Sequence, residues 1–121
     1  MQNGIDISIY QVVGSPLCVA SSDGERVHDR IAAALREGRK VSLSFLNVST
    51  LTSAFLNAAI GQLYGEFDEA TIRALLEVKD IEPDDRELLK RVVETAKHYF
   101  KDPNAFNAAI RETLEIEDDD G

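Results

Sequence analysis

A cluster of hydroxyl groups is the feature of this sequence whose residue types most directly suggest chemistry. Four of five consecutive residues carry a side-chain hydroxyl, namely Ser49, Thr50, Thr52 and Ser53. One interpretation is structural: Thr50 or Thr52 caps the helix that follows, and the other hydroxyls turn the chain. The other interpretation is regulatory. Ser53 would lie exposed in the first helical turn, where a phosphoryl group adds about −1.5 to −2 charges and repels an acidic partner surface.

Other nucleophiles and metal ligands are few and far apart. Cys18 is the only cysteine, and it lies in the apolar run Leu17–Ala20, where burial would raise the pKa of the thiol and make it inert. His28 lies in a charged stretch and is expected to be exposed, while His98 lies in the last turn of a long helical pattern. Neither histidine has a second histidine four residues away, so neither forms a helical histidine pair for a metal ion. The sequence therefore predicts no catalytic residue, no metal and no cofactor, and a dyad of Cys18 with a histidine is the enzyme hypothesis that stays open.

The charge and the glycines limit the classes of partner. The net charge is −9, from 13 Lys and Arg against 22 Asp and Glu. An acidic chain repels phosphate backbones, so neither nucleic acid nor an anionic membrane is an expected partner. The glycines are scattered and form neither GxGxxG nor GxxxxGK[ST], which disfavours nucleotide binding of those kinds. Paired carboxylates such as Asp84 and Asp85 are expected to face solvent, where no pocket shifts their pKa toward general acid chemistry.

The length and composition predict a single globular domain. The chain has 121 residues, of which 44% are hydrophobic and 29% charged, so a hydrophobic core is attainable without disulfides or metal. No apolar run approaches the ~18 residues that cross a bilayer. The first residues lack the basic start and apolar stretch of a signal peptide. We therefore expect a cytoplasmic protein.

The first part of the chain reads as strand, strand and helix. Alternation of apolar and polar residues, followed by β-forming residues, predicts a strand over Ile5–Val13. Leu17–Ala20 is expected to be a short second strand that closes a hairpin on the first. Ser22 and Glu25 have the spacing of a capping box, which predicts a helix over residues 23–37.

The rest of the chain alternates strands and helices. The expected elements are a strand over Val41–Leu46, a helix from Thr52 to Tyr64, a helical turn over Asp68–Arg73, a strand over Leu75–Ile81 and a helix over Pro83–Lys101. For the strand over Leu75–Ile81, a longer helix is the alternative. Asp102–Pro103 breaks the pattern. A last short helix is indicated by Phe106, Ala109, Ile110 and Leu114.

These elements predict an α/β fold with helices packed against a small mixed sheet of about four strands. The helices and strands up to residue 114 are expected to form one domain. Residues 115–121 form an acidic tail that is expected to be solvated and frayed.

The segment from Val41 to Tyr64 resembles the STAS-like α/β family of unknown function, in which a strand runs into a helix of the pattern TSSFLNEAFGxLY. In this sequence Ser53-Ala-Phe-Leu-Asn57 and Gly61-Gln-Leu-Tyr64 have the expected spacing. The resemblance covers about residues 5–100 and implies a STAS-like fold with a C-terminal helix.

More distantly, the segment looks like the anti-sigma-factor antagonists that define the STAS fold, and Ser53 matches their regulatory serine. Thr52 stands where those proteins have an acidic residue. The resemblance implies a non-catalytic regulatory module bound by a protein partner, such as a GHKL-type ATPase kinase or an anti-sigma factor. Partner docking would then involve Ser49, Thr50, Thr52, Ser53, Asn57 and Gln62. A constitutive structural or homo-oligomeric adaptor subunit is the alternative, and a small enzyme with an unrecognised pocket is a further one.

Overall fold

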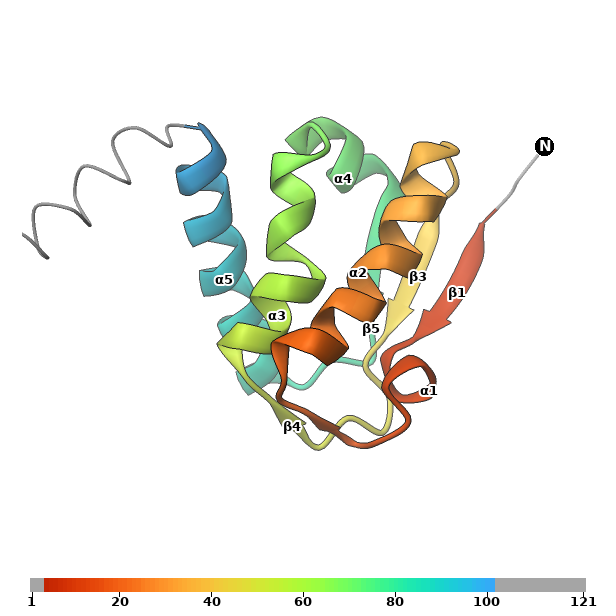
Figure 1. The fold of residues 1–121 in the computed structure, drawn as a ribbon, viewed down its shortest axis with the longest axis vertical. Coiled ribbons are helices and arrows are strands. Elements are labelled where there is room, and N and C mark those ends of the chain that lie inside the picture. Colours follow the sequence, from red (N-terminus) through yellow and green to blue (C-terminus); the bar gives the residue numbers. More distant parts are fainter. Residues whose placement is uncertain (1–3, 102–121) are drawn as a thin grey trace, which may run out of the picture.

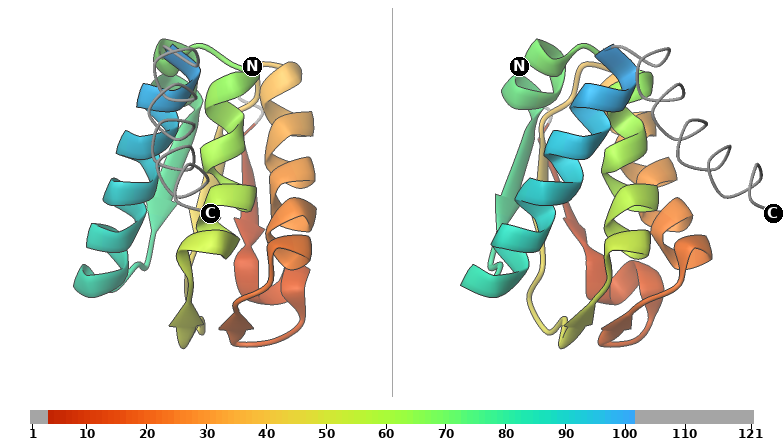
Figure 2. Two further views of the ribbon diagram at one scale, coloured as in Figure 1. Left: turned by 60° about the vertical axis from the view of Figure 1, so that its left-hand side comes forward. Right: turned by 90° about the vertical axis from the view of Figure 1, so that its left-hand side faces the viewer.

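Helices cover one face of a parallel sheet in the computed structural model, which describes residues 4–101 (Figure 1). The sheet has the order β1-β3-β5, and every neighbouring pair in it is parallel. Its strands are β1 (Ile5–Ser8), β3 (Val41–Ser44) and β5 (Leu76–Lys79). Figure 2 shows the main helices together on one side of this sheet: α2 (Ser21–Arg36), α3 (Ser53–Ala59) and α5 (Pro83–Lys101).

The strands alternate between a helix-covered face and an open face. Ile7, Val41 and Leu43 are buried under the helices. In the register of the sheet, Asp6 pairs with Ser42 and Ser42 with Glu77, so polar side chains share the opposite face. A sheet with one polar face needs helices on the other face only, and the crossover helices therefore gather in one layer.

The predicted first strand is wrong beyond Ser8, because the chain continues as the short helix α1 (Ile9–Val13). The Ser8 side chain accepts a hydrogen bond from the backbone N–H of Gln11 at 3.2 Å, which caps this helix. Gly14, with φ 81°, ends it in the left-handed conformation. These local caps override the β preference of the residues between them.

The predicted second strand exists as β2 (Leu17–Cys18), but it forms no hairpin with β1. It pairs in parallel with β4 (Thr50–Leu51), a strand that lies inside the hydroxyl-rich connection and was not predicted. The described residues thus contain a three-stranded and a two-stranded parallel sheet. The prediction of one mixed sheet of about four strands is wrong in this respect.

Helix α2 was predicted correctly, but its predicted cap was not. The helix begins at Ser21 after Ala20, which makes no side-chain cap hydrogen bond, so the capping box of Ser22 and Glu25 is wrong. Gly24 lies directly against α3, where an added Cβ would be 2.5 Å from the carbonyl oxygen of Phe55. Packing on α3, which needs a residue without a side chain here, therefore fixes the first turns of α2.

The second half of the fold follows the predicted order. The strands β3 and β5 and the helix α5 are confirmed, and the predicted turn after residue 68 is α4 (Glu69–Leu75). The helix predicted from Thr52 to Tyr64 is divided, because α3 ends at Ala59 and a 3₁₀ helix, η1 (Gly61–Gly65), follows it. The last predicted helix and the acidic tail lie outside the described residues.

The core lies between the helix layer and the sheet. Phe55 and Leu56 of α3 and Leu63 of η1 are fully buried, together with Ile31 of α2 and Leu43 of β3. Of the helices that the structure describes, none combines the length and the apolar composition needed to cross a membrane. The first turn of α3 is therefore anchored in the core by Phe55 and Leu56, while its first two residues, Ser53 and Ala54, are exposed.

Candidate partner-binding surface

The start of α3 is fixed by Thr52. Its hydroxyl oxygen accepts a hydrogen bond from the backbone N–H of Phe55 at 3.1 Å, and the same hydroxyl donates to the backbone carbonyl of Val19 at 2.7 Å. Of the two caps that the sequence allowed, Thr52 and not Thr50 is therefore the one used. Ser53 follows as the first residue of α3 and is exposed.

Ser49 and Thr50 bind the chain to the loop before β2. The backbone N–H groups of Ser49 and Thr50 donate to the carbonyl of Pro16, at 2.9 and 3.3 Å, and the Ser49 hydroxyl donates to it at 3.3 Å. Both side chains are exposed. The hydroxyl-rich segment is therefore held mainly through its backbone, and its side chains face outward.

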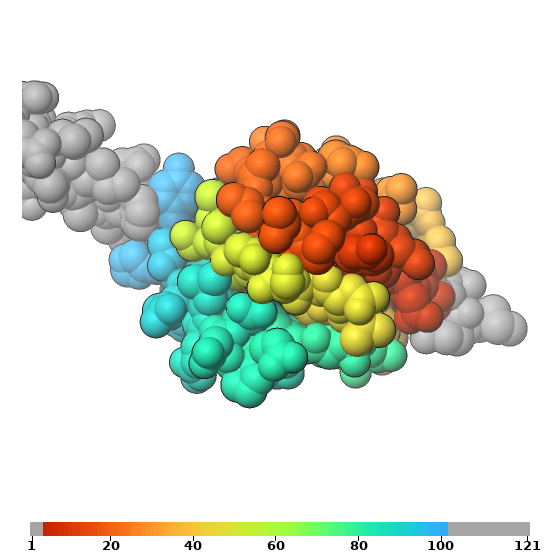
Figure 3. Space-filling model, turned by 90° about the horizontal axis from the view of Figure 1, so that it is seen from below, coloured from red at the N-terminus to blue at the C-terminus, as the bar shows by residue number. Residues whose placement is uncertain are grey.

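Three apolar side chains are exposed beside these hydroxyls. The exposed fractions are 54% for Leu17, 44% for Val19 and 59% for Leu46. We call these three residues, together with Ser49, Thr50, Thr52 and Ser53, the junction surface. Figure 3 shows this side of the molecule, where the yellow segment with β4 runs between the red-orange segment with β2 and the teal start of α5.

The sequence analysis missed the apolar part of the junction surface. The predicted burial of Cys18 is confirmed, but the other residues of the apolar run Leu17–Ala20, for which no exposure was predicted, are exposed. The period of two around Cys18 was the available signal, since neighbours of a buried strand residue point away from the core. Leu46 was predicted as the last residue of the strand over Val41–Leu46, but β3 ends at Ser44, and Leu46 lies next to Asn47, whose φ of 71° places it in a left-handed turn.

Asn57 and Gln62 belong to a different surface, between α3 and α5. Asn57 lies with Ser53 and Ala54 of α3 opposite Leu88, Arg91 and Thr95 of α5 around a hollow of about 510 Å³. A second hollow of about 380 Å³ continues from Asn57 and Thr95 to Gln62, Tyr99 and Phe100. We call these two hollows the α3–α5 groove. The structure thus divides the six predicted partner-binding residues between two surfaces that share Ser53.

A further hollow of about 590 Å³ lies at the amino-terminal ends of the strands, lined by residues such as Asp6, Lys40, Arg73 and Glu77. Open α/β sheets bind their ligands at the carboxyl ends of the strands, which is the side where α3 begins. The polar hollow at the opposite end is therefore not the candidate site.

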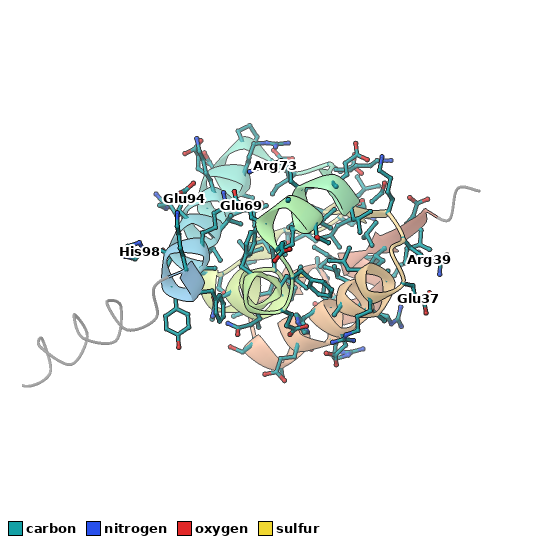
Figure 4. The ribbon with its side chains drawn as sticks, turned by 90° about the horizontal axis from the view of Figure 1, so that it is seen from above. Glu37, Arg39, Glu69, Arg73, Glu94 and His98 are labelled. Atoms are coloured by element: carbon teal, nitrogen blue, oxygen red, sulfur yellow. The ribbon has the colours of Figure 1, made fainter. Side chains whose placement is uncertain are left out.

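The candidate nucleophile and the histidines do not come together. Cys18 is fully buried, and burial, with a smaller contribution from the Asp23 carboxylate, raises the pKa of its thiol to about 11. His28 is half-buried rather than exposed as predicted, because its Nε2 lies 2.8 Å from Glu66 Oε2 and its Nδ1 lies 3.2 Å from Asp29 Oδ1. His98 is exposed on the outer side of α5 (Figure 4).

An ion-pair cluster joins α4 to α5 on the side of α5 away from the groove. Glu69 Oε2 accepts a hydrogen bond from Arg73 Nη2 at 2.7 Å (Figure 4). The same Oε2 lies 2.8 Å from Lys97 Nζ. The hydrogen bond from Lys97 lowers the pKa of Glu69 and raises that of Lys97. Burial raises the pKa of Tyr64 nearby. Among residues 4–101, no group of three or more His, Cys, Asp or Glu side chains could hold a metal ion.

Comparison with known proteins gives one match. A family model described as a STAS-like domain of unknown function (DUF4325) matches residues 23–86, which is more than half of the chain. The matched range includes α3 and all six predicted partner-binding residues, and it ends in the first turn of α5. No curated protein and no solved structure matches the chain.

Proposed function

The chain belongs to the family of STAS-like domains of unknown function, and on this basis we propose that it is a non-catalytic regulatory module that binds a protein partner through the junction surface. Phosphorylation of Ser53 would switch this binding off. The kinase would transfer the terminal phosphoryl group of ATP to the Ser53 hydroxyl and release ADP. A GHKL-type ATPase kinase or an anti-sigma factor is the class of partner that the resemblance implies.

One observation carries this proposal: Ser53 is exposed at the first residue of α3, next to exposed apolar side chains. Isolated exposed leucines are ordinary, but Leu17, Val19 and Leu46 flank one polar segment, which is the composition of a small protein interface. The cap made by Thr52 fixes the backbone on which Ser53 is presented. A phosphoryl group there would place about two negative charges in the interface, where an unpaired charge is costly.

The state of Cys18 supports a non-catalytic function over the cysteine–histidine enzyme. A thiol with a pKa of about 11 is protonated at neutral pH, and a protonated thiol is a poor nucleophile. The nitrogen atoms of His28 are directed at Glu66 and Asp29. Cys18 is thus committed to packing and His28 to other polar contacts, while His98 lies on the exposed side of α5 and Cys18 is fully buried.

The test is binding and phosphoryl transfer with a purified GHKL-type ATPase encoded in the same genome. We expect ATP-dependent incorporation of phosphate into the wild-type chain and none into Ser53→Ala. Ser53→Asp should weaken binding at least tenfold, because it leaves a charge in the interface. Ser53→Ala should bind within a few-fold of wild type. The matched control is Ala33→Asp, which adds the same charge at an exposed position in the middle of α2.

The outcomes separate the switch from its alternatives. Equal binding by Ser53→Asp and Ser53→Ala would show that the switch is wrong and would leave a constitutive adaptor. A concentration-dependent dimer whose formation is lost in Leu46→Asp would indicate that the junction surface binds a second copy of the chain. The absence of any binding to the ATPase would rule out that class of partner.

A further inference from the structure

The α3–α5 groove reaches the end of the described chain. Its far end is formed by Tyr99 and Phe100, directly before Lys101, and residues 102–121 follow. We propose that residues 105–115 of this same chain bind in the α3–α5 groove as an amphipathic helix, with the acidic residues after them beside Arg91. This docking requires neither phosphorylation nor the partner of the proposed function.

The first argument is that α5 carries two apolar stripes. Leu89 and Val93 face the side of Leu76 and Val78 in β5, so this stripe is covered by the sheet. Leu88 and Val92 lie on a second stripe, four residues apart, and line the α3–α5 groove. Val92 is already buried in the core, so Leu88, which is half-buried at the edge of the groove, is the side chain of this stripe that an added helix would cover.

The second argument is the pattern of the occupant. Phe106, Ala109, Ile110 and Leu114 have the spacing of one helical face. Asp102–Pro103 disfavours continuation of α5, since the residue before proline avoids the helical conformation. Residues 102–104 alone link α5 to the proposed segment. A link this short gives an effective concentration in the millimolar range, so a weak contact between the segment and the groove is enough to populate the docked state.

The third argument is that the lengths agree. From Leu88 to Phe100 the groove wall of α5 is about 18 Å long, at 1.5 Å per residue. A helix over residues 105–115 would be about 16 Å long, which is close to that length. Running antiparallel to α5, it would place Phe106 beside Phe100 and Leu114 beside Val92. The side chains of Asn57 and Gln62, both exposed on the α3–η1 side, would form the polar rim of this contact.

The fourth argument is charge complementarity. In this antiparallel register, Glu115, Glu117 and Asp118 come next to the part of the groove that contains Arg91. Arg91 is exposed and takes part in none of the ion pairs within the described part of the chain. An acidic segment beside an exposed guanidinium gains Coulomb energy that a neutral segment would not.

The test uses two adjacent alanines in the full-length chain. On a helix, Ala109 lies on the face of Phe106 and Ile110, whereas Ala108 lies on the opposite face. We expect Ala109→Asp to shift the NMR signals of the Asn57 and Gln62 side-chain amides and of the Thr95 methyl group. The docked population should fall roughly tenfold or more, because a carboxylate would enter an apolar contact. Ala108→Asp should leave these signals in place.

A second pair of variants tests the charge argument. Arg91→Glu should give the same signal shifts at Gln62 and Tyr99 as Ala109→Asp, while Lys90→Glu, one residue away and outside the groove lining, should not. Signals unchanged in Ala109→Asp, or changed equally in Ala108→Asp, would overturn the proposal. The wild-type chain is also measured at decreasing concentration. If its Asn57 and Gln62 signals move on dilution to the positions seen in Ala109→Asp, the proposal is overturned, since the occupant would then be a second copy.

Discussion

The junction surface and the α3–α5 groove meet at Ser53, but they are held by different forces. In the junction surface, hydrogen bonds to two backbone carbonyls, those of Pro16 and Val19, fix the segment, and its side chains remain exposed. In the groove, side chains of two helices pack against one another around an apolar floor. Loss of one hydroxyl should therefore disturb the structure of the junction surface, and introduction of a charge should disturb the packing in the groove.

The difference also bears on what each surface can bind. A segment fixed through its backbone presents the same hydroxyls whether or not a partner is present, which would suit recognition by the kinase that we propose for Ser53. A groove between helices fits a helix of complementary shape, because ridges of side chains interlock with such grooves. Both surfaces depend on α3, so the perturbation with the largest effect is one that removes the support of this helix.

Phe55→Ala is expected to have the largest effect, because it should weaken both surfaces together. Phe55 is fully buried between α3 and the rest of the core, and replacing a buried phenylalanine by alanine costs about 3–5 kcal/mol. Urea unfolding measures this change. Ala33→Ser on the exposed side of α2 is the control and should change stability by less than about 0.5 kcal/mol. If Phe55→Ala does not fold, Phe55→Leu should give a smaller loss in the same direction; stability equal to wild type would contradict the role of Phe55.

Alkaline pH is expected to have the next largest effect, through Cys18 beneath the junction surface. The pKa of the thiol rises from its ordinary value of 9.0 to about 11 in the folded chain. Above pH 9 the unfolded chain therefore loses this proton while the folded chain keeps it, so stability falls as pH rises from 9 to 11. The total loss of stability, reached once the pH exceeds both pKa values, is about 2–3 kcal/mol.

The variant Cys18→Ala provides the control for this pH dependence. Its stability should fall less between pH 9 and 11 in urea unfolding than that of the wild type. A part of the fall should remain above pH 10, because burial also raises the pKa of Tyr64, and Tyr64→Phe should remove that part. An identical pH profile for wild type and Cys18→Ala would show that the thiol is accessible to water in the folded chain.

Periodicity predicted the parts of this fold that are held by the core. The helices α2 and α5 and the strands β3 and β5 bury long apolar stripes, and such stripes are visible in a single sequence. The junction was predicted less well, because its geometry comes from pairing at a distance. Nothing local in Thr50–Leu51 indicates that these residues pair with Leu17–Cys18, more than thirty positions earlier in the chain.

The candidate site shows the same division. Local capping chemistry was enough to predict that Ser53 is exposed at the start of a helix. It also limited the capping residue to Thr50 or Thr52, without deciding between them. The apolar half of the junction surface was missed, because Leu17 and Val19 have the composition of core residues and the strand that contains Cys18 is only two residues long, too short for its alternation to stand out. The role of α5 as the second wall of the groove depends on tertiary packing, which no local pattern around Asn57 reports.

Thr52→Ala is expected to affect the junction surface more than the groove, because Thr52 binds Val19 as well as capping α3. The substitution removes both the cap of α3 and the hydrogen bond to Val19, which together should cost about 1–2 kcal/mol. Urea unfolding measures the loss, and labelling of Cys18 by a thiol reagent should become faster because β2 loses its tie to α3. Thr50→Ala, whose side chain is exposed, is the matched control. Equal labelling rates in the two variants would mean that Thr52 does not hold the junction closed.

The smallest expected effect lies on the side of α5 away from the groove, in Lys97→Met. Lys97 and Glu69 are both partly exposed, and Glu69 keeps Arg73 as a partner, so the variant should lower the melting temperature only slightly at low salt. At about 1 M NaCl, where the screening length is about 3 Å, the difference from wild type should vanish. Lys90→Met is the matched control, an exposed lysine of the same helix that takes part in none of the ion pairs within residues 4–101. A loss in Lys97→Met that persists at high salt would mean that the hydrogen bond from Lys97 to Glu69, and not a screened charge interaction, carries the contribution of Lys97, because methionine keeps an apolar stem of similar length.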